Sequence, residues 1–281
     1  MGARHRTFFE SEGVRFVQIL DIGNAANISE NPACVVDFAV IASPASTHYD
    51  YARNFLQKGV SVFVEKPLAL NGEQAQELAD IAREKNTTLF VAQSECFNPL
   101  FLNFRKHFLK ELERFCGEAS AEGVRLKFRR EHRFSPRCRD VNVSLDLLVH
   151  DLGLFFTLFK FEDVDVCDQK LFADGDAASV RLKVARGPYQ GVEADFYVNR
   201  NSDSDSRTIS VEFAEKISAP AASYTISLAR YNERGELMHL PESLENEHRF
   251  FLKLLAGACS DWGTRLAQTA ADAVKVAGKL A

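Results

Sequence analysis

The sequence predicts an α/β protein in which a parallel, doubly wound sheet is followed by an α+β domain with an open, mainly antiparallel sheet. Two observations support this fold class. Through residue 95, apolar runs typical of buried strands alternate with amphipathic helical segments. After Pro99, several strand-like runs follow one another with no helix between them. The 281 residues are enough for two modest domains, expected at 1–95 and 96–281.

The first half is expected to form strand–helix units with right-handed crossovers. Val36–Ala42 is a continuous apolar run, as in a strand buried on both faces. Ser43-Pro44 ends it, Ser46 or Thr47 can cap the next helix, and Gly59 stops that helix. The other strands expected here are Val14–Asp21, Val60–Val64 and Thr88–Ala92, and a second helix runs from Asn71 or Gly72 through Lys85.

In the second half, Gly123–Arg133 alternates apolar and basic residues, which is typical of a strand with one solvated face. Its basic residues are therefore expected on that face, although an anion-binding patch is an alternative. Helices are expected at Leu100–Phe115, Val143–Phe159, Glu242–Ala258 and Gly263–Leu280. Further strands are expected at Val164–Ala173, Ala178–Ala185, Val192–Val198, Thr208–Phe213 and Tyr224–Tyr231.

Composition excludes several classes of protein. The net charge of −5 and the lack of a basic stripe argue against nucleic-acid binding. No apolar run approaches the length of a membrane span, and no secretory signal is apparent. The six cysteines are scattered without metal-ligand spacing, which favours a reduced, cytoplasmic protein without a metal site.

Glu65-Lys66-Pro67 is the most informative motif. It follows the buried run Val60–Val64, so Lys66 is expected at the carboxyl edge of the sheet, where open α/β sheets bind ligands. Pro67 lacks a backbone donor and ends the strand there. A lysine at this edge can bind a substrate oxygen or stabilise an alkoxide; alternatively, it is a surface lysine before a turn.

Asp146 and His150 form a second candidate constellation. They are separated by four residues in a predicted helix, so they share one face. A carboxylate in that position can orient an imidazole that takes a proton from a hydroxyl while hydride leaves the same carbon. A local polar pair is the alternative, but Leu145, Leu147 and Leu148 make such a pair costly unless it is partnered or functional.

Asn98 follows the last parallel strand and is expected over the same sheet edge as Lys66. Its amide can offer a donor and an acceptor to a sugar-like hydroxyl. It can equally cap the helix that begins at Pro99, and the two roles are compatible.

The N-terminus is unusual for a Rossmann-like domain. Such a domain needs a strand, a G-x-G-x-x-G turn and a helix whose N-terminus faces the pyrophosphate. Here Gly2 stands where the third glycine belongs, and a helix is expected to follow through Phe9. Asp21 then ends the next expected strand at roughly the 20-residue distance at which an acid meets the ribose hydroxyls.

These motifs resemble the Gfo/Idh/MocA family of oxidoreductases, most of all its nucleotide-sugar 3-dehydrogenase branch. The resemblance covers nearly the whole chain. It rests on Met1–His5, on the stretch from Asp37 to Lys66 with its Glu65-Lys66-Pro67 motif, on Phe97-Asn98-Pro99, on Asp146 with His150-Asp151, and on the two closing helices.

The resemblance implies NAD-dependent hydride transfer, with NADP not excluded, on a ring hydroxyl of a sugar, nucleotide sugar or cyclitol. Lys66 would contact the nicotinamide ribose and the reacting hydroxyl, His150 would be the general acid/base, and Asp146 would support it. The implied cofactor contacts are Gly2, His5, Asp21, Ser43, Pro44, His48, Glu65 and Gln93, and the implied substrate contacts are Asn98 and Asp151. The family's Lys-Pro bond is often cis.

The first strand and the first two glycines of the pattern are absent, which suggests an N-terminally incomplete version of an active dehydrogenase. The other function class is a cofactor-impaired relative that acts as a sugar-binding or oligomeric subunit. The open sheet of the second half predicts a homodimer or homotetramer in either case.

Overall fold

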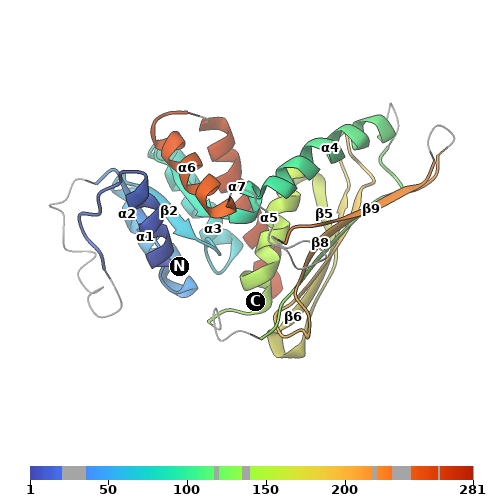
Figure 1. Ribbon diagram of the computed structural model, residues 1–281, viewed down its shortest axis with the longest axis horizontal. Coiled ribbons are helices and arrows are strands. Elements are labelled where there is room, and N and C mark those ends of the chain that lie inside the picture. Colours follow the sequence, from blue (N-terminus) through green and yellow to red (C-terminus); the bar gives the residue numbers. More distant parts are fainter. Residues whose placement is uncertain are drawn as a thin grey trace.

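The computed structural model describes residues 1–20, 36–116, 120–134, 140–216, 220–229, 242–258 and 260–280. Figure 1 shows two sheets with helices between and around them. The main helices are α1 (Gly2–Ser11), α2 (His48–Gln57), α3 (Gly72–Glu84), α4 (Pro99–Cys116), α5 (Val149–Leu158), α6 (Ser243–Leu255) and α7 (Ser260–Ala277).

The first sheet contains β1 (Phe38–Ile41), β2 (Ser61–Glu65) and β3 (Leu89–Ala92), paired in parallel in chain order. Its central and last strands are almost fully buried, as their unbroken apolar sequences predict. Their aromatic rings form much of the core: Phe63 stacks on Phe90 with centroids 5.3 Å apart, and Phe251 of α6 packs edge-on to Phe63. A fully buried side chain of this size contributes about 1.5–3 kcal/mol.

The strand expected at Val14–Asp21 is wrong for the residues that the structure describes. Residues 14–20 have no strand assignment, and Val17 and Ile19 are about half exposed. The physical reason is the lack of a partner. In the doubly wound order 3-2-1-4-5-6, a strand that follows the first helix pairs with the strand before that helix. Among the described residues, no strand pairs with residues 14–20.

The second sheet has six strands in the order β5-β6-β7-β4-β8-β9. All neighbours are antiparallel except β4 and β7, which confirms the mainly antiparallel prediction. The strands are β4 (Val124–Glu131), β5 (Val164–Phe172), β6 (Ala177–Val184), β7 (Glu193–Asn199), β8 (Ser206–Phe213) and β9 (Ala222–Ser227).

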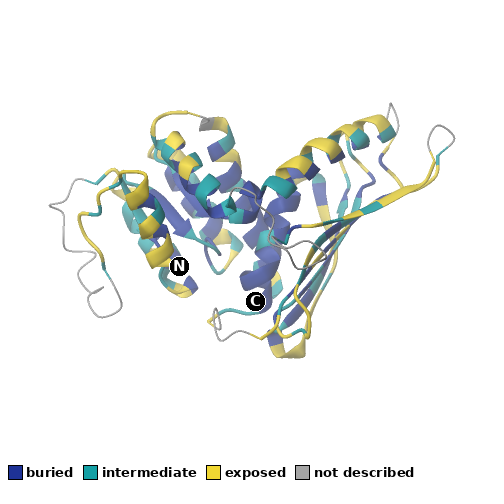
Figure 2. Ribbon diagram, in the orientation of Figure 1, coloured by how far each residue is buried: buried dark blue, intermediate teal, exposed yellow. Residues whose placement is uncertain are grey.

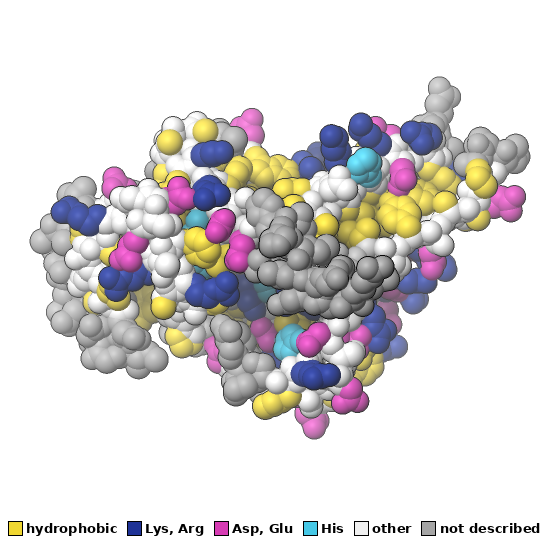
Figure 3. All heavy atoms as spheres, viewed as in Figure 1, with side chains coloured by type: hydrophobic (Ala, Val, Ile, Leu, Met, Phe, Trp, Pro, Cys, Tyr) yellow, Lys and Arg dark blue, Asp and Glu magenta, His cyan; other side chains and the backbone are white. Residues whose placement is uncertain are grey.

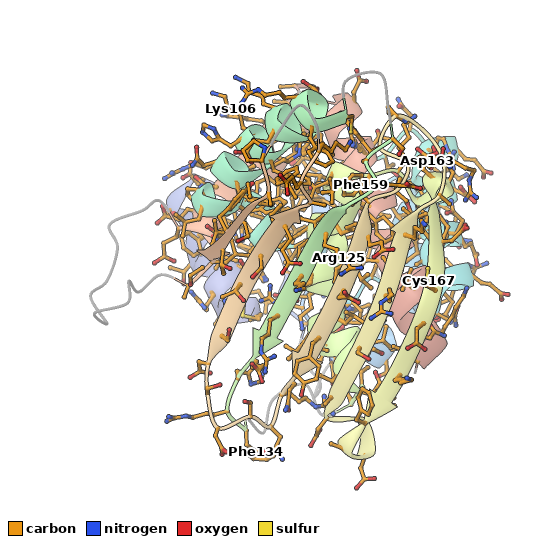
Figure 4. All side chains as sticks on the ribbon, turned by 90° about the vertical axis from the view of Figure 1, so that its right-hand side faces the viewer. Lys106, Arg125, Phe134, Phe159, Asp163 and Cys167 are labelled. Atoms are coloured by element: carbon orange, nitrogen blue, oxygen red, sulfur yellow. The ribbon has the colours of Figure 1, made fainter. Side chains whose placement is uncertain are left out.

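One face of this sheet is apolar and the other is polar. In β4, Val124, Leu126 and Phe128 are buried, whereas Arg125 and Lys127 are exposed. Helices α4 and α5 cover the apolar face (Figures 1 and 2). Among the described residues, no helix lies in front of the polar face, from which Arg125 and Cys167 project (Figure 4).

The closing helices return to the first sheet. Helix α7 packs against α3, β3 and α5, and α6 contacts α1. Figure 2 shows that α5, between the two sheets, is buried along nearly its whole length. The first sheet therefore receives part of its cover from the last forty residues of the chain, and the two expected domains share an extensive boundary.

The face of the molecule seen in Figure 3 is not dominated by side chains of one charge. On the face seen in Figure 3, basic side chains gather along α4, while acidic and basic side chains mix elsewhere. Among the described residues, no helix has the length and apolarity needed to span a bilayer.

Candidate functional site

The Glu65-Lys66-Pro67 turn lies at the carboxyl end of β2, and its Lys66–Pro67 bond is cis, as the family resemblance predicts. The Lys66 side chain is 14% exposed. Its ammonium donates to two oxygens of Asp146, the backbone carbonyl at 2.7 Å and Oδ1 at 2.8 Å. Lys66 of the first sheet and Asp146 of the second half therefore meet at the carboxyl edge of the parallel sheet, where a ligand site was predicted.

Asp146 lies in a π-helical turn, η4 (Ser144–Leu148), that leads directly into α5. π turns within α-helices occur frequently at functional sites. The expected contact between Asp146 and His150 is not formed, because Asp146 Oδ1 accepts from Lys66 and Oδ2 lies 3.7 Å from the Arg200 guanidinium. His150 Nδ1 is buried without a hydrogen-bond partner.

His150 is held in its neutral form. Burial lowers its pKa well below the usual value, and the nearby charges of Lys66, Arg130 and Arg207 lower it further. A neutral imidazole with an unpartnered nitrogen can accept a proton at neutral pH.

An ion network that the sequence reasoning missed supports the segment around His150. Arg130 is 4% exposed and donates through Nε and Nη2 to Asp151, with a shortest distance of 2.7 Å, and through Nη1 to Glu95 at 3.1 Å. Arg207 reaches the same Glu95 oxygen at 3.0 Å. The two carboxylates raise the pKa of Arg130 although burial opposes this, so the guanidinium stays charged.

A sequence signal for this network exists. Along β4 the buried positions are Val124, Leu126, Phe128 and then Arg130. An arginine therefore stands in the alternating series of buried positions that are otherwise apolar. A buried arginine requires a carboxylate partner. The exposed phase, by contrast, places Arg125 3.0 Å from Glu193 on the polar sheet face.

The two candidate substrate contacts are already engaged. Asp151 is 4% exposed and is occupied by Arg130. Asn98 Oδ1 accepts from the backbone N–H of Leu100, which is the capping role considered above, and its Nδ2 donates to Glu95 and to the Leu228 carbonyl. In this structure, both side chains therefore bind neighbouring protein groups and help to hold the site in place.

The N-terminus of α1 lies at the carboxyl end of β1. An added Cβ at Gly2 would sit 3.7 Å from the Ala42 side chain, and no side chain caps the helix. Free backbone N–H groups and the helix dipole favour an anion at such a position. The residues present therefore fit one phosphate of a dinucleotide. Asp21, the expected ribose ligand, lies outside the described residues.

Ser43 and Pro44 follow β1 at the same edge and are partly or fully exposed. His48 is buried beneath them, with Nδ1 2.7 Å from the Pro67 carbonyl and Nε2 2.9 Å from the Ser43 carbonyl. It joins the Lys66–Pro67 turn to the Ser43 loop instead of pointing at a ligand.

Three other expected cofactor contacts also point inward. His5 is fully buried, and its two ring nitrogens face Glu65 and His248. Glu65 is engaged by His5. Gln93 is 5% exposed and packs so tightly on α5 that a Cβ at Gly153 would lie 2.4 Å from its Oε1. Within the described residues, no group of three or more metal-ligating side chains gathers to form a metal site.

A groove of about 1090 Å³ lies away from this site, between α3 and the end of α7, with Gln76, Asp80 and Lys275 among its lining residues. It contains neither Lys66 nor His150. The chemistry-bearing residues instead gather at the carboxyl edge of the parallel sheet.

Together, the parallel sheet and its edge lysine are typical of a Rossmann-type dinucleotide-binding domain. Residues 2–93 match the Gfo/Idh/MocA family model, described as an oxidoreductase family with an NAD-binding Rossmann fold. The predicted family and fold class are thus confirmed.

Relatives of known name agree with this assignment. UDP-N-acetylglucosamine 3-dehydrogenase of Acidithiobacillus ferrooxidans is 33% identical over 131 residues, covering 47% of this chain and 38% of that protein. Biliverdin reductase A of Mus musculus is 48% identical over 54 residues, covering 19% of this chain and 18% of that protein. The chain therefore aligns with less than half of either relative.

The solved structure of UDP-N-acetylglucosamine 3-dehydrogenase GnnA from the same Acidithiobacillus species has the same fold. It superposes with a TM-score of 0.63 at 23% identity, covering 96% of this chain and 84% of the other. The likeness extends through both sheets, beyond the 2–93 segment.

Proposed function

We propose that this protein is an NAD(P)-dependent oxidoreductase that transfers a hydride between a nicotinamide cofactor and a ring hydroxyl of a sugar, nucleotide sugar or cyclitol. The observation that carries the proposal is the placement of Lys66 and His150. They come from different halves of the chain, Lys66 is bonded to Asp146 one turn before His150, and the Lys66 charge acts on the His150 ring.

His150 would accept the proton of the substrate hydroxyl, since its lowered pKa keeps the imidazole neutral at physiological pH. Lys66 would donate to the same oxygen and stabilise the alkoxide as it forms. Asp146 holds the ammonium at this position. When bound, the nicotinamide cofactor would supply the hydride acceptor.

NAD is proposed as the cofactor on two grounds. The family is described as NAD-binding, and Asp21 is the kind of residue that binds free ribose hydroxyls. The Gly2 helix terminus and the Ser43–Pro44 loop are proposed to contact the phosphates. Lys66 is proposed to reach the nicotinamide ribose.

A sugar-like substrate is supported by the charge balance of the site. Arg130 is paired with Asp151 and Glu95, so Lys66, held in place by Asp146, is the cation proposed to meet the reacting oxygen. Such a site suits hydroxyl groups. The named relative that acts on a nucleotide sugar supports the same class.

A homodimer or homotetramer is proposed because, in the part of the chain that the structure describes, no helix covers the polar face of the second sheet (Figure 4). A monomeric mass at micromolar concentration, measured by light scattering, would contradict this. We also propose a cytoplasmic location, because scattered single cysteines are typical of proteins in a reducing compartment.

The test of the proposal uses the full chain with NAD and NADP against a panel of nucleotide sugars, free sugars and cyclitols. His150→Asn and Lys66→Met are each expected to lower turnover by roughly 10²–10⁴. His107→Asn, at an exposed position of α4, is the matched control and should leave turnover unchanged. Undiminished turnover in His150→Asn would remove this residue from the chemistry.

A second candidate is a cofactor-impaired relative that binds sugars without turnover. It is retained because the outer edge of β1 has no paired strand among the described residues. Calorimetric titration with NADH separates the two. Saturable binding by this chain supports the oxidoreductase, while sugar binding without NADH binding supports the alternative.

A further inference from the structure

A chain of hydrogen bonds joins α6, α1 and β2 behind Lys66. His248 Nδ1 lies 2.5 Å from the Leu244 carbonyl, His248 Nε2 lies 2.9 Å from His5 Nδ1, and His5 Nε2 lies 2.7 Å from Glu65 Oε1. His248 and His5 are at most 1% exposed. The three side chains come from the two ends and the first third of the sequence.

The partners in this chain determine where its protons lie. The Leu244 carbonyl can only accept, so His248 Nδ1 carries a proton. Burial lowers the pKa of His248 to about 4, so its ring is neutral and Nε2 accepts from His5 Nδ1–H. His5 Nε2 then faces a carboxylate oxygen, which also only accepts. The 2.7 Å contact therefore requires a second ring proton on His5.

Glu65 links this chain to the candidate site. Its Oε2 accepts the backbone N–H of Lys66 at 3.2 Å while Oε1 is held by His5. Burial would raise the pKa of Glu65, but the hydrogen bond and charge of His5 outweigh it and lower the pKa. Glu65 is thus a fixed carboxylate at the root of the Lys66 side chain.

The other titratable groups that face the chain add no competing charge. Lys66 is paired with Asp146. Glu247, on α6, is fully buried with neither oxygen hydrogen-bonded, and burial together with the Glu65 charge raises its pKa well above the usual value. Burial thus favours the neutral acid form of Glu247, and the charges that act on Glu65 are those of His5 and Lys66.

We propose that His248 and His5 are positioning residues for Lys66. His248, anchored on the Leu244 carbonyl, holds His5 as an imidazolium, and His5 fixes the Glu65 carboxylate that sets the backbone of Lys66. This chain of hydrogen bonds, called the relay below, ends at the Leu244 backbone carbonyl, which has no proton to pass on. It therefore holds the side chains in position and does not transfer protons. Its effect on turnover rests on the proposed function, whereas its protonation pattern does not.

The protonation pattern is tested in the wild-type full chain by ¹⁵N NMR of the histidine rings at neutral pH. His5 is expected to carry protons on both ring nitrogens and His248 on Nδ1 alone. A His5 ring with a single proton, or a His248 ring protonated on Nε2, would overturn the assignment. This measurement needs neither cofactor nor substrate.

Two variants separate hydrogen bonding from packing. His248→Phe keeps a ring against Phe9 and Phe63, where the His248 centroid distances are 4.5 and 5.2 Å, but removes the acceptor. His248→Gln keeps an acceptor near the Nε2 position but removes the ring. The relay predicts that His5 loses its second ring proton in His248→Phe and keeps it in His248→Gln.

For turnover, His248→Phe is expected to fall about threefold to tenfold below His248→Gln in kcat, with KM little changed, as for one lost hydrogen bond. The reverse order would show that only ring packing matters and would overturn the proposal. If His248→Phe does not fold, the ¹⁵N spectra of the wild-type histidine rings still test the proposed protonation pattern. If the wild type shows no turnover, the proposed function fails while the NMR result stands.

Discussion

Replacing Arg130 by methionine is expected to destabilise the protein far more than the same change at Arg125 on the same strand. Arg130 is the partner of Asp151 through Nε and Nη2, at 2.7–3.2 Å, and the Asp151 side chain is only 5% exposed. Glu95 loses one contact but keeps Arg207. The substitution therefore leaves one buried carboxylate without its cation.

Removing one member of a buried ion pair costs about 3–5 kcal/mol. Arg125 faces Glu193 on the polar sheet face with 56% of its side chain exposed, and such surface pairs contribute about 0–1 kcal/mol. The two variants should therefore differ by roughly 2–5 kcal/mol. At about 2–4 °C per kcal/mol, this corresponds to a difference in Tm of roughly 4–20 °C.

Equilibrium urea unfolding of both variants, checked by thermal melts, measures this difference. Burial already raises the pKa of Asp151, so the folded variant binds more protons than the unfolded chain and its deficit should shrink as pH falls. Adding Asp151→Leu to Arg130→Met should recover part of the loss. A difference below about 1 kcal/mol between the Arg130 and Arg125 variants would refute the buried network.

Three further outcomes follow from the structure. The pKa of His150 is lowered, so below about pH 6.5 the unfolded chain binds a proton that the folded chain excludes. The wild type should therefore lose stability between pH 7 and 5 more steeply than His150→Leu, as measured by parallel thermal melts. Gly153→Ala should lower stability in urea unfolding by less than about 1 kcal/mol, because its Cβ at 2.4 Å displaces only the amide end of Gln93 and alanine favours the helix; a larger loss would show that Gln93 cannot move. Cys167, which is exposed, should react with iodoacetamide faster than Cys96, whose pKa is raised by burial, and equal labelling by mass spectrometry would count against this difference.

Much of the fold follows from local sequence pattern. The strand β2, the helix α3 beginning at Asn71 or Gly72, and the alternating burial of β4 were all predicted, because each depends on neighbours within a few residues. The position of Lys66 at the sheet edge follows from the same logic. The strand expected at Val14–Asp21 was wrong for the described residues 14–20, because a strand also depends on pairing, which local pattern does not report.

The sequence by itself determined the succession of helices and strands, the apolar face of each, and the residue types of the site, since periodicity and turn chemistry are local properties. Only the tertiary structure decided that Asp146 binds Lys66 instead of His150, that Arg130 is buried between two carboxylates, and that His248 meets His5. These contacts join residues far apart in the chain. Their partners are selected by which surfaces pack together, and burial then makes each unpaired charge too costly to leave alone.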